Sequence, residues 1–289
     1  MTKPRGKRRK KPQGAPVRAV RGVRYADRGP ITALRVLGQG FELPLDPGRS
    51  EFRIGRNGPP ATDIQLSFPS VSGVHALIRR IEGDGIEVAD LGSKNGVWDG
   101  YSSAPSQRLT LYASHSFGLG GVGLLALDER THRLVKPLTE YGGVHQDVDQ
   151  ALQAVMLGNP LFLCGSRADD VLGLARMLHA DSVRRGYPFV KLDELPVSDV
   201  AIRRLCARAV YGTVFVDLTK PQQISYKLAE ILLSPCYDRF WTIMVMPHCD
   251  MALECFGGTA ELAIHSACKL GFPRVGWQLA IGEVHFTER

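Results

Sequence analysis

Apolar and polar residues alternate in short runs between about residues 31 and 130. The clearest runs are EFRIG (51–55), HALIRRI (75–81), GIEVADL (85–91) and QRLTLY (107–112), and Gly, Pro, Asn and Asp separate them. An alternation of period two puts every second side chain on the same face of a strand. Many short strands at this spacing are typical of two packed sheets. We therefore expect an all-β sandwich over residues 31–130.

The pattern changes after residue 145, where runs of helical and strand length alternate. Helical spacing is found in residues 147–157, 169–182, 199–210, 225–233 and 259–270, and apolar strand-like runs in residues 160–165, 188–192, 213–218, 241–247 and 276–281. Strands that are apolar throughout are typical of a parallel sheet covered on both faces. The sequence therefore predicts a multidomain chain, with a doubly wound, three-layer α/β domain over residues 146–289. Residues 131–145 between the two patterns are interpreted as a linker.

Composition narrows the class of protein. A chain of 289 residues, 44% of them apolar, can form two cores. No apolar stretch is long enough to cross a membrane, and we expect neither a membrane partner nor a secretory signal. The six cysteines lie in the second half of the chain without a Cys-x-x-Cys pair. They are interpreted as reduced core thiols of a cytoplasmic protein rather than as a zinc site or disulfides, so no metal and no cofactor is predicted.

The basic charge of the chain is concentrated in one segment. Residues 1–28 contain eleven Lys and Arg residues and one acidic residue, so this segment carries +10 and the rest of the chain −3 of the total of +7. Its few apolar residues cannot form a core, which predicts a disordered basic tail. Such a tail is usually only solvated; the alternative is binding of nucleic acid, independent of sequence and weakened by salt.

Four short motifs follow one another within the expected sandwich. They are IGR (54–56), DIQLSFPSVSGVHALI (63–78), DLGSKNG (90–96) and DG (99–100). Together, their Gly-Arg, Ser-x-x-His and Asp-x-x-Ser-x-Asn-Gly patterns resemble those of the forkhead-associated (FHA) domain, and the resemblance covers the whole of residues 31–130. It implies a binding site for a phosphothreonine peptide on the loops at one end of the sandwich.

By this resemblance, four residues would contact the phosphopeptide. Arg56 and Ser72 would bind the phosphate, Lys94 would add a further donor, and Asn95 would hydrogen-bond the peptide backbone. These residue types suit the chemistry, because a phosphothreonine brings about −1.5 to −2 charges and three acceptor oxygens. The planar fork of an arginine donates hydrogen bonds to such a group in pairs.

Supporting residues and departures from the family pattern also follow from the resemblance. Gly55, His75 and Gly96 would support the loops, His75 by bracing its own loop. Gly73 stands where a polar or basic residue is frequent, which would weaken or retune binding, and Val97 stands where Thr is usual, which concerns packing. Each motif residue alone has an ordinary explanation, since an Asn-Gly pair usually forms only a turn. A sandwich whose site no longer binds remains the alternative.

Residues 160–190, which include FLCGSRADDVLGLARMLHADSVRR (162–185), resemble the AAA+ ATPase domain of bacterial enhancer-binding transcription activators. That family has Gly-x-x-x-x-Gly-Lys-Glu, then Ala-Arg-x-Ile-His-x-x-Ser-x-Arg, then Pro-Phe-Val. Counted from Gly165 without a gap, the matching residues are Ala175, Arg176, Leu178, His179, Ser182, Arg184, Pro188, Phe189 and Val190. The later segment GTVFVDLT (212–219) resembles the Walker B segment of the family, Gly-Thr-Leu-Phe-Leu-Asp-Glu.

The same register shows that the residues needed for nucleotide chemistry are missing. Asp170 stands in place of the second P-loop glycine, and Val171 in place of the phosphate-binding lysine. Asp217 keeps the Walker B aspartate, whereas Leu218 replaces the residue that would polarise the attacking water. Without the lysine and the glutamate, the domain is interpreted as a catalytically inactive pseudo-ATPase that is kept for its surface.

These observations predict a phosphothreonine-dependent adaptor in bacterial signalling or transcription regulation that is not an enzyme. Its main partner would be a threonine-phosphorylated protein, either the substrate of a Ser/Thr kinase or the kinase itself. The α/β domain would dock a second protein. Two other classes stay open: a residual nucleotide-binding switch, and a nucleic-acid-associated transcriptional regulator that acts through the basic tail.

Overall fold

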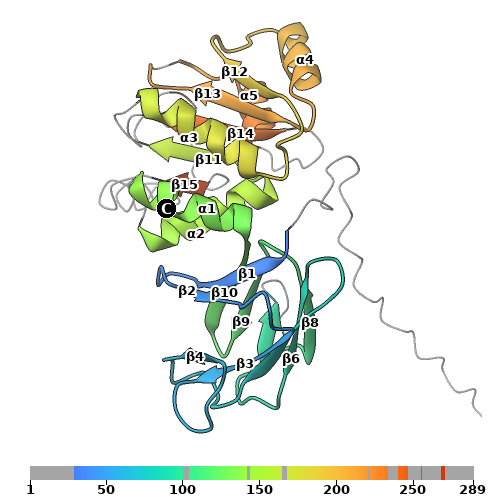
Figure 1. The fold of residues 1–289 in the computed structure, drawn as a ribbon. Coiled ribbons are helices and arrows are strands. Elements are labelled where there is room, and N and C mark those ends of the chain that lie inside the picture. Colours follow the sequence, from blue (N-terminus) through green and yellow to red (C-terminus); the bar gives the residue numbers. More distant parts are fainter. Residues whose placement is uncertain are drawn as a thin grey trace, which may run out of the picture.

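The computed structural model describes residues 29–99, 104–141, 144–164, 168–220, 222–233 and 240–246, with residue 255 and residues 268–270. The first part of the described chain consists of strands: β1 (Ile31–Val36), β2 (Glu42–Pro44), β3 (Glu51–Arg56), β4 (Ile64–Leu66), β5 (Ala76–Arg80), β6 (Ile86–Asp90), β7 (Val97–Asp99), β8 (Arg108–Leu111), β9 (Ser116–Leu119) and β10 (Val122–Asp128). The second part contains helices and strands: α1 (Glu129–Glu140), α2 (His145–Leu157), β11 (Leu161–Cys164), α3 (Ala168–Asp181), β12 (Phe189–Leu192), α4 (Asp199–Arg208), β13 (Thr213–Asp217), α5 (Tyr226–Leu233), β14 (Trp241–Met246) and β15 (Cys268–Leu270). Figure 1 shows the strand-only part below and the α/β part above.

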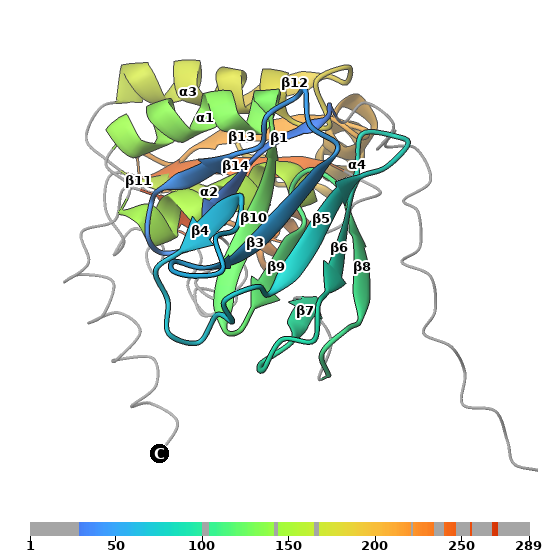
Figure 2. The same cartoon turned by 60° about the horizontal axis from the view of Figure 1, so that its bottom comes forward.

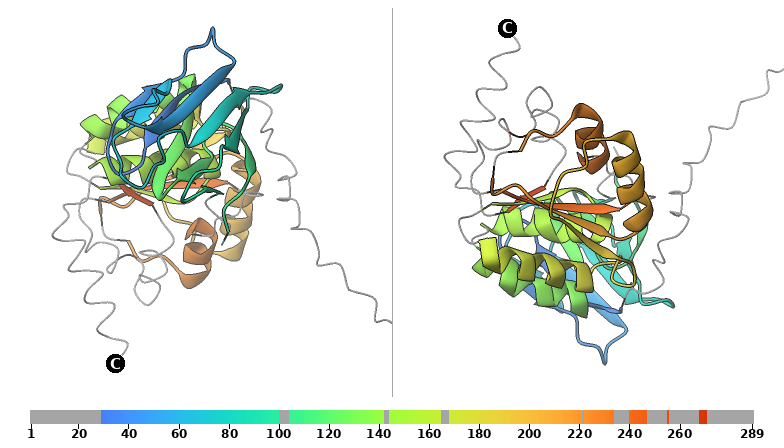
Figure 3. Two further views of the ribbon diagram at one scale, coloured as in Figure 1. Left: turned by 90° about the horizontal axis from the view of Figure 1, so that it is seen from below. Right: turned by 90° about the horizontal axis from the view of Figure 1, so that it is seen from above.

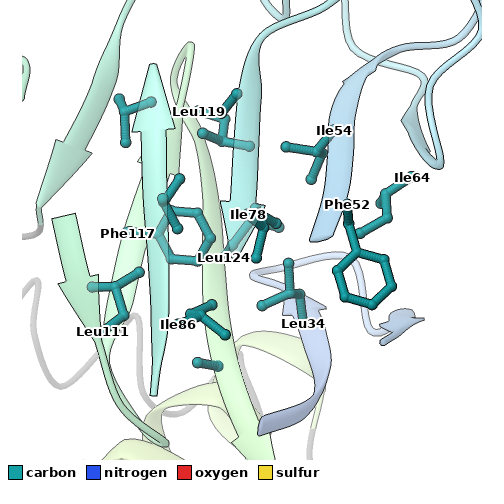
Figure 4. Packing of buried hydrophobic residues seen from close by; sticks show 14 of the residues in the cluster. Leu34, Phe52, Ile54, Ile64, Ile78, Ile86, Leu111, Phe117, Leu119 and Leu124 are labelled. Carbon is teal, nitrogen blue, oxygen red and sulfur yellow. The ribbon is translucent and has the colours of Figure 1, made fainter. Parts of the chain in front are cut away.

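Strands β1 to β10 form a sandwich of two five-stranded sheets. Sheet A has the strand order β2-β1-β10-β9-β7, and sheet B has the order β4-β3-β5-β6-β8. Figure 2 shows the sheet B strands β3, β5, β6 and β8 side by side. Apolar side chains of both sheets fill the space between them, among them Phe52 and Ile78 from sheet B and Phe117 and Leu124 from sheet A (Figure 4). The predicted all-β sandwich is confirmed.

The alternation along β3 illustrates why this sequence forms a sandwich. Phe52 and Ile54 are buried, whereas Glu51, Arg53 and Arg56 are exposed. Burial of a large apolar side chain contributes roughly 1.5–3 kcal/mol to stability. A shift of the register by one residue would expose the apolar side chains and bury the charged ones. The pattern therefore fixes which face of the strand points inward.

Strands β11 to β15 form sheet C, with the order β12-β13-β14-β11-β15. All of its described pairings are parallel. Helices α1, α2 and α3 lie on one face of sheet C and α4 and α5 on the other, as Figure 3 shows. Strands β13 and β14 are buried along almost their whole length, as expected for a parallel sheet that is covered on both faces.

Residues 131–145, which the sequence marks as a linker, lie largely in helix α1. Asp128, the last residue of β10, is the N-cap of this helix. Its carboxylate accepts hydrogen bonds from the backbone N–H of Thr131 at 2.8 Å and from the Thr131 hydroxyl at 2.6 Å. Leu134 and Leu138, four residues apart, are fully buried, as on one face of an amphipathic helix. The chain therefore passes from strand to helix without a loop.

The sandwich and the α/β layers share a hydrophobic core. On the outer face of sheet A, Ala33, Leu125 and Leu127 pack in one cluster with apolar residues of α1, α2, α3 and sheet C. Figure 1 shows α1 and α2 between sheet C and the strands β1 and β10. Separation of the two parts would expose apolar surface on both sides of this contact. We therefore describe them as one packed unit.

A buried ion pair crosses the same contact. Arg35 of β1, whose side chain is 1% exposed, donates from Nε to the carboxylate of Asp149 on α2, and its Nη1 lies 3.3 Å from Glu42. The second oxygen of Asp149 accepts the N–H of Gly38 at 2.7 Å. A buried charge without a partner is very costly. The pair therefore holds α2 against sheet A in one position.

A second prediction also differs from the structure. The prediction of a helix over residues 259–270 was wrong at its end, because residues 268–270 form β15, which pairs in parallel with β11. A short apolar run fits a helix or a strand equally well, and backbone pairing with β11 decides the outcome here. The predicted strand over residues 276–281 and the basic tail lie outside the described residues. No helix in the described part of the chain is both long and apolar enough to span a membrane.

Candidate functional site

Loops at one end of the sandwich approach each other closely because two glycines meet there. A Cβ on Gly55 would lie 2.0 Å from the carbonyl oxygen of Gly73, so only glycine lets β3 come this close to the loop before β5. The Arg56 N–H donates to the Ser72 carbonyl at 2.8 Å. Arg56 is exposed, and its guanidinium has no hydrogen bond or ion pair within the described part of the chain. An arginine with unused donors is therefore held beside the Ser72 loop.

His75 ties the Ser72 loop to the loop between β6 and β7. Its side chain is fully buried, its Nδ1 accepts the Ser72 N–H at 3.1 Å, and its Nε2 lies 2.9 Å from the carbonyl oxygen of Gly96. A carbonyl can only accept, so this arrangement fits the neutral ring with its proton on Nε2. The two loops are thereby held at a fixed separation.

The loop between β6 and β7 is closed by its own side chains. The Asp90 carboxylate accepts the Ser93 N–H at 2.9 Å, and Ser93 Oγ accepts the Gly96 N–H at 2.9 Å. Gly96 has a φ of 74°, in the left-handed region that favours glycine. Asp and Ser side chains commonly stabilise turns in this way. The turn leaves Lys94 and Asn95 exposed at its tip.

Two hydrogen bonds join this tip directly to the loop of Ser72. The Lys94 N–H donates to Ser72 Oγ at 3.0 Å, and the Asn95 side-chain amide donates to the Ser70 carbonyl at 2.8 Å. Arg56 reaches the same loop through its backbone bond to Ser72. The structure thus brings Arg56, Ser72, Lys94 and Asn95 to one edge of the sandwich. Such a cationic, donor-rich edge can bind a dianionic group.

Comparison with protein families identifies the unit that carries these loops. Residues 52–109 match the family model of the FHA domain. The chain contains an FHA domain. The resemblance seen in the sequence is thereby confirmed for the sandwich, and all four loop residues lie within the matched part of the FHA domain.

Solved FHA domains are similar to about a third of the chain. The FHA domain of the CT664 protein from Chlamydia trachomatis has 33% identity and covers 33% of this chain and 95% of its own, with a TM-score of 0.30. The FhaA FHA domain complexed with the intracellular domain of Rv3910 has 28% identity, covers 32% and 96%, and has a TM-score of 0.28. A domain from a structural and functional analysis of phosphothreonine-dependent FHA domain interactions has 27% identity, covers 34% and 98%, and has a TM-score of 0.28. No curated protein matches the chain.

Some residues to which the sequence assigns no role of their own also hold the FHA loops in place. Ser93 closes the turn described above, and the Trp98 indole N–H donates to the Asn95 carbonyl at 2.7 Å. The Gly120 N–H, from the turn between β9 and β10, donates to the Gly96 carbonyl at 3.1 Å. The Asp-x-x-Ser spacing could have revealed Ser93 as a turn residue. No local sequence pattern reveals the role of Gly120, because its hydrogen-bond partner Gly96 is distant in the sequence.

The candidate nucleotide site at the start of α3 has a different character from the FHA loops. Val171, at the position of the phosphate-binding lysine in the AAA+ resemblance, is fully buried in the core shared with the FHA domain. Gly165 lies outside the described residues, and the Asp170 side chain is not among the described ones. In the described part of the chain, no group of three or more His, Cys, Asp or Glu side chains could hold a metal ion.

At the end of β13, where the resemblance puts Walker B, Asp217 and Leu218 are already hydrogen-bonded within the protein. The Asp217 carboxylate accepts hydrogen bonds from the N–H of Thr219 at 2.9 Å and from its hydroxyl at 2.6 Å. Leu218 is fully buried, and its N–H donates to the carbonyl of Val245 at 2.8 Å. An apolar side chain in this position cannot polarise a water molecule.

Three polar residues in the AAA+-like register are buried and hydrogen-bonded. His179 Nδ1 lies 2.8 Å from the Thr213 hydroxyl oxygen, and the Ser182 hydroxyl donates to the His179 carbonyl at 2.8 Å. Arg184, which is 1% exposed, donates from Nη1 to the Tyr211 carbonyl at 2.8 Å. Burial lowers the pKa of His179, and the charge of Arg184 lowers it further, against an opposing hydrogen bond with the backbone of Tyr187. These side chains join α3 to β13 and neighbouring loops.

Proposed function

We propose that this protein is an adaptor in bacterial signalling that binds a threonine-phosphorylated protein through its FHA domain and has no enzymatic activity of its own. One observation carries the proposal: Arg56, Ser72, Lys94 and Asn95 converge on one edge of an FHA domain, on loops that are hydrogen-bonded to each other. The partner would be the substrate of a Ser/Thr kinase or the kinase itself.

The bonds already made within the loops leave the groups that a phosphopeptide needs. Ser72 Oγ accepts the Lys94 N–H, so its own proton remains for a phosphate oxygen. The Asn95 amide nitrogen is engaged with Ser70, so its oxygen remains to accept an N–H of the peptide backbone. The exposed Arg56 fork can bind two phosphate oxygens.

For the α/β layer we infer a role without catalysis, as a pseudo-ATPase that docks a second protein. The support is the burial of Val171 and Leu218, at the positions that would have to contact phosphate and activate water. A lysine and a glutamate at these positions carry the corresponding chemistry in the AAA+ family that the sequence resembles. Saturable binding of magnesium-ATP to the whole chain would overturn this part of the proposal.

The test is capture of peptides from a phosphothreonine library by the whole chain, with its unphosphorylated copy as reference. We expect enrichment that depends on the phosphate. Arg56→Ala should lower the affinity by thirty-fold or more, which corresponds to about 2–5 kcal/mol. Arg56→Lys should recover part of the affinity, because a point charge cannot replace the paired fork. Arg79→Ala is the matched control, since Arg79 is exposed on sheet B and pairs with Glu51 at 2.7 Å. Equal capture of both libraries would refute the proposal.

A further inference from the structure

A groove crosses the outer face of sheet A beside the FHA loops. Its floor is the backbone of Gly118 on β9 and Gly123 on β10, which lie opposite each other in the antiparallel pairing. Trp98 of β7, the cross-strand neighbour of Gly118, lines one side, and Leu37 also lines the groove. The groove has a volume of about 340 Å³, within the size range of pockets that accept ligands.

The chemistry of this groove favours an apolar occupant. Gly118 and Gly123 belong to strands whose backbones pair with each other, and glycine adds no polar side chain to the floor. The Trp98 ring and the Leu37 side chain are only partly buried, so both present apolar surface to the groove. Asp99 also lines the groove but already has an interaction of its own. An aromatic or branched aliphatic side chain would gain the most binding free energy in this groove, because it would remove the apolar surface from water.

Two residues that line the groove connect it to the loops assigned to the phosphopeptide. Trp98, which lines it, donates its indole N–H to the carbonyl of Asn95 at 2.7 Å. Gly121, which also lines it, follows Gly120, where a Cβ would lie 2.3 Å from the Ser70 carbonyl oxygen. The same Ser70 carbonyl accepts the side chain of Asn95. A chain that is bound over Asn95 therefore has the groove directly beside it.

We propose that this groove is a second contact for the threonine-phosphorylated partner. It would take an aromatic or aliphatic side chain of that partner from outside the residues that flank the phosphothreonine. This inference rests on the proposed function, because the phosphothreonine holds the partner next to the groove. The phosphate loops supply the dependence on phosphorylation, and the groove adds selection among phosphorylated proteins.

The decisive variant fills the groove without touching the phosphate loops. A Cβ on Gly118 would meet only ordinary contacts, 3.6 Å from Trp98 Cβ and 3.8 Å from the Val122 carbonyl oxygen. Gly118→Val therefore suits the strand and occupies the floor, and Gly118→Ala is a milder second variant. Thr110→Val is the matched control, since it adds a valine to an exposed position of β8 on sheet B.

The measurement compares binding of phosphothreonine libraries of about nine and about twenty-five residues to the whole chain, with thermal unfolding as a check on folding. In the long library we expect enrichment of an aromatic or aliphatic residue distant from the phosphothreonine, with a gain in affinity of about tenfold, as burial of one large apolar side chain provides. Gly118→Val should lose this gain and bind the short library like the unmodified chain, and Thr110→Val should keep both.

The outcomes separate this inference from the proposed function. A long-library gain that Gly118→Val retains, or no enriched distal position, overturns the groove assignment while phosphate dependence stands. Self-association that Gly118→Val abolishes would also overturn it, since the groove would then bind a second copy of the chain. Loss of phosphate dependence in both libraries refutes the proposed function itself.

Discussion

The loop end of the FHA domain and helix α3 of the α/β layer carry motif residues in opposite environments. In the FHA domain, Arg56, Lys94 and Asn95 are exposed, and buried residues such as His75 hold their loops. In the α/β layer, the polar motif residue His179 is buried, and so is Val171, where a ligand contact would be needed. Exposed polar groups on braced loops are available for binding, whereas buried ones contribute to packing. Motif residues therefore lie at the surface in one region and in the core in the other.

The largest effect is expected where a lysine is introduced at position 171 of the α/β layer. Val171→Lys should lower the free energy of unfolding by at least about 3 kcal/mol, because it leaves an unpaired charge in the shared core. It should produce no ATP turnover, even when combined with Asp170→Gly, since Leu218 remains. Chemical denaturation measures the first effect and phosphate release the second. Ala180→Lys, on the exposed face of α3, is the control and should leave the free energy of unfolding nearly unchanged. ATP turnover in the double variant would contradict the prediction.

In the FHA domain, the addition of one methyl group should have different effects at Gly55 and at Gly73, which lie next to each other in space. Gly55→Ala should lower stability by about 1–3 kcal/mol and weaken phosphopeptide binding, because its Cβ would lie 2.0 Å from the Gly73 carbonyl oxygen. Gly73→Ala should be tolerated, since its nearest contacts would be 3.8 Å away. Thermal unfolding and peptide titration measure both variants. Equal tolerance of the two changes would show that the close approach does not position Arg56.

A smaller effect concerns the pH dependence of the α/β layer. The pKa of His179 is lowered in the fold, so the unfolded chain binds a proton near pH 6.5 that the folded chain binds only at lower pH. Stability should therefore fall as the pH decreases below about 6.5, because the unfolded chain then binds a proton that the folded chain does not. His179→Gln should show a flatter profile between pH 7 and pH 5 in urea denaturation. Parallel profiles for the two proteins would mean that His179 does not titrate as its burial requires.

The smallest effect should come from the tip of the loop between β6 and β7. Asn95→Ala removes an exposed hydrogen bond to Ser70, so stability should change by only about 0.5–1.5 kcal/mol. Binding of a phosphothreonine peptide should still weaken several-fold, because a contact to the peptide backbone is lost. Isothermal titration with Asn57→Ala as an exposed control measures this. Unchanged affinity would remove Asn95 from the binding edge.

The sequence predicts those parts of the molecule whose signal is local. Period-two alternation located the strands of the sandwich, and the order of four motifs located Arg56 and Asn95. The sequence predicts a linker over residues 131–145, where the structure has helix α1, which contains Pro137 and has few buried residues. The groove could not be predicted, since Gly118 is paired with Trp98 on another strand and no local pattern records that pairing. Packing between distant segments decides such features.

Asp128 ends β10 and begins α1 in the same residue, and this junction limits how the molecule can relay a signal. A hinge needs a few residues whose backbone angles can change freely, and here the connection is capped and the surrounding surfaces are buried. A phosphoprotein bound to the FHA loops would thus keep a constant orientation relative to sheet C. A conformational change that couples peptide binding to the α/β layer must then be a small sliding of packed layers rather than a rotation of one domain against another.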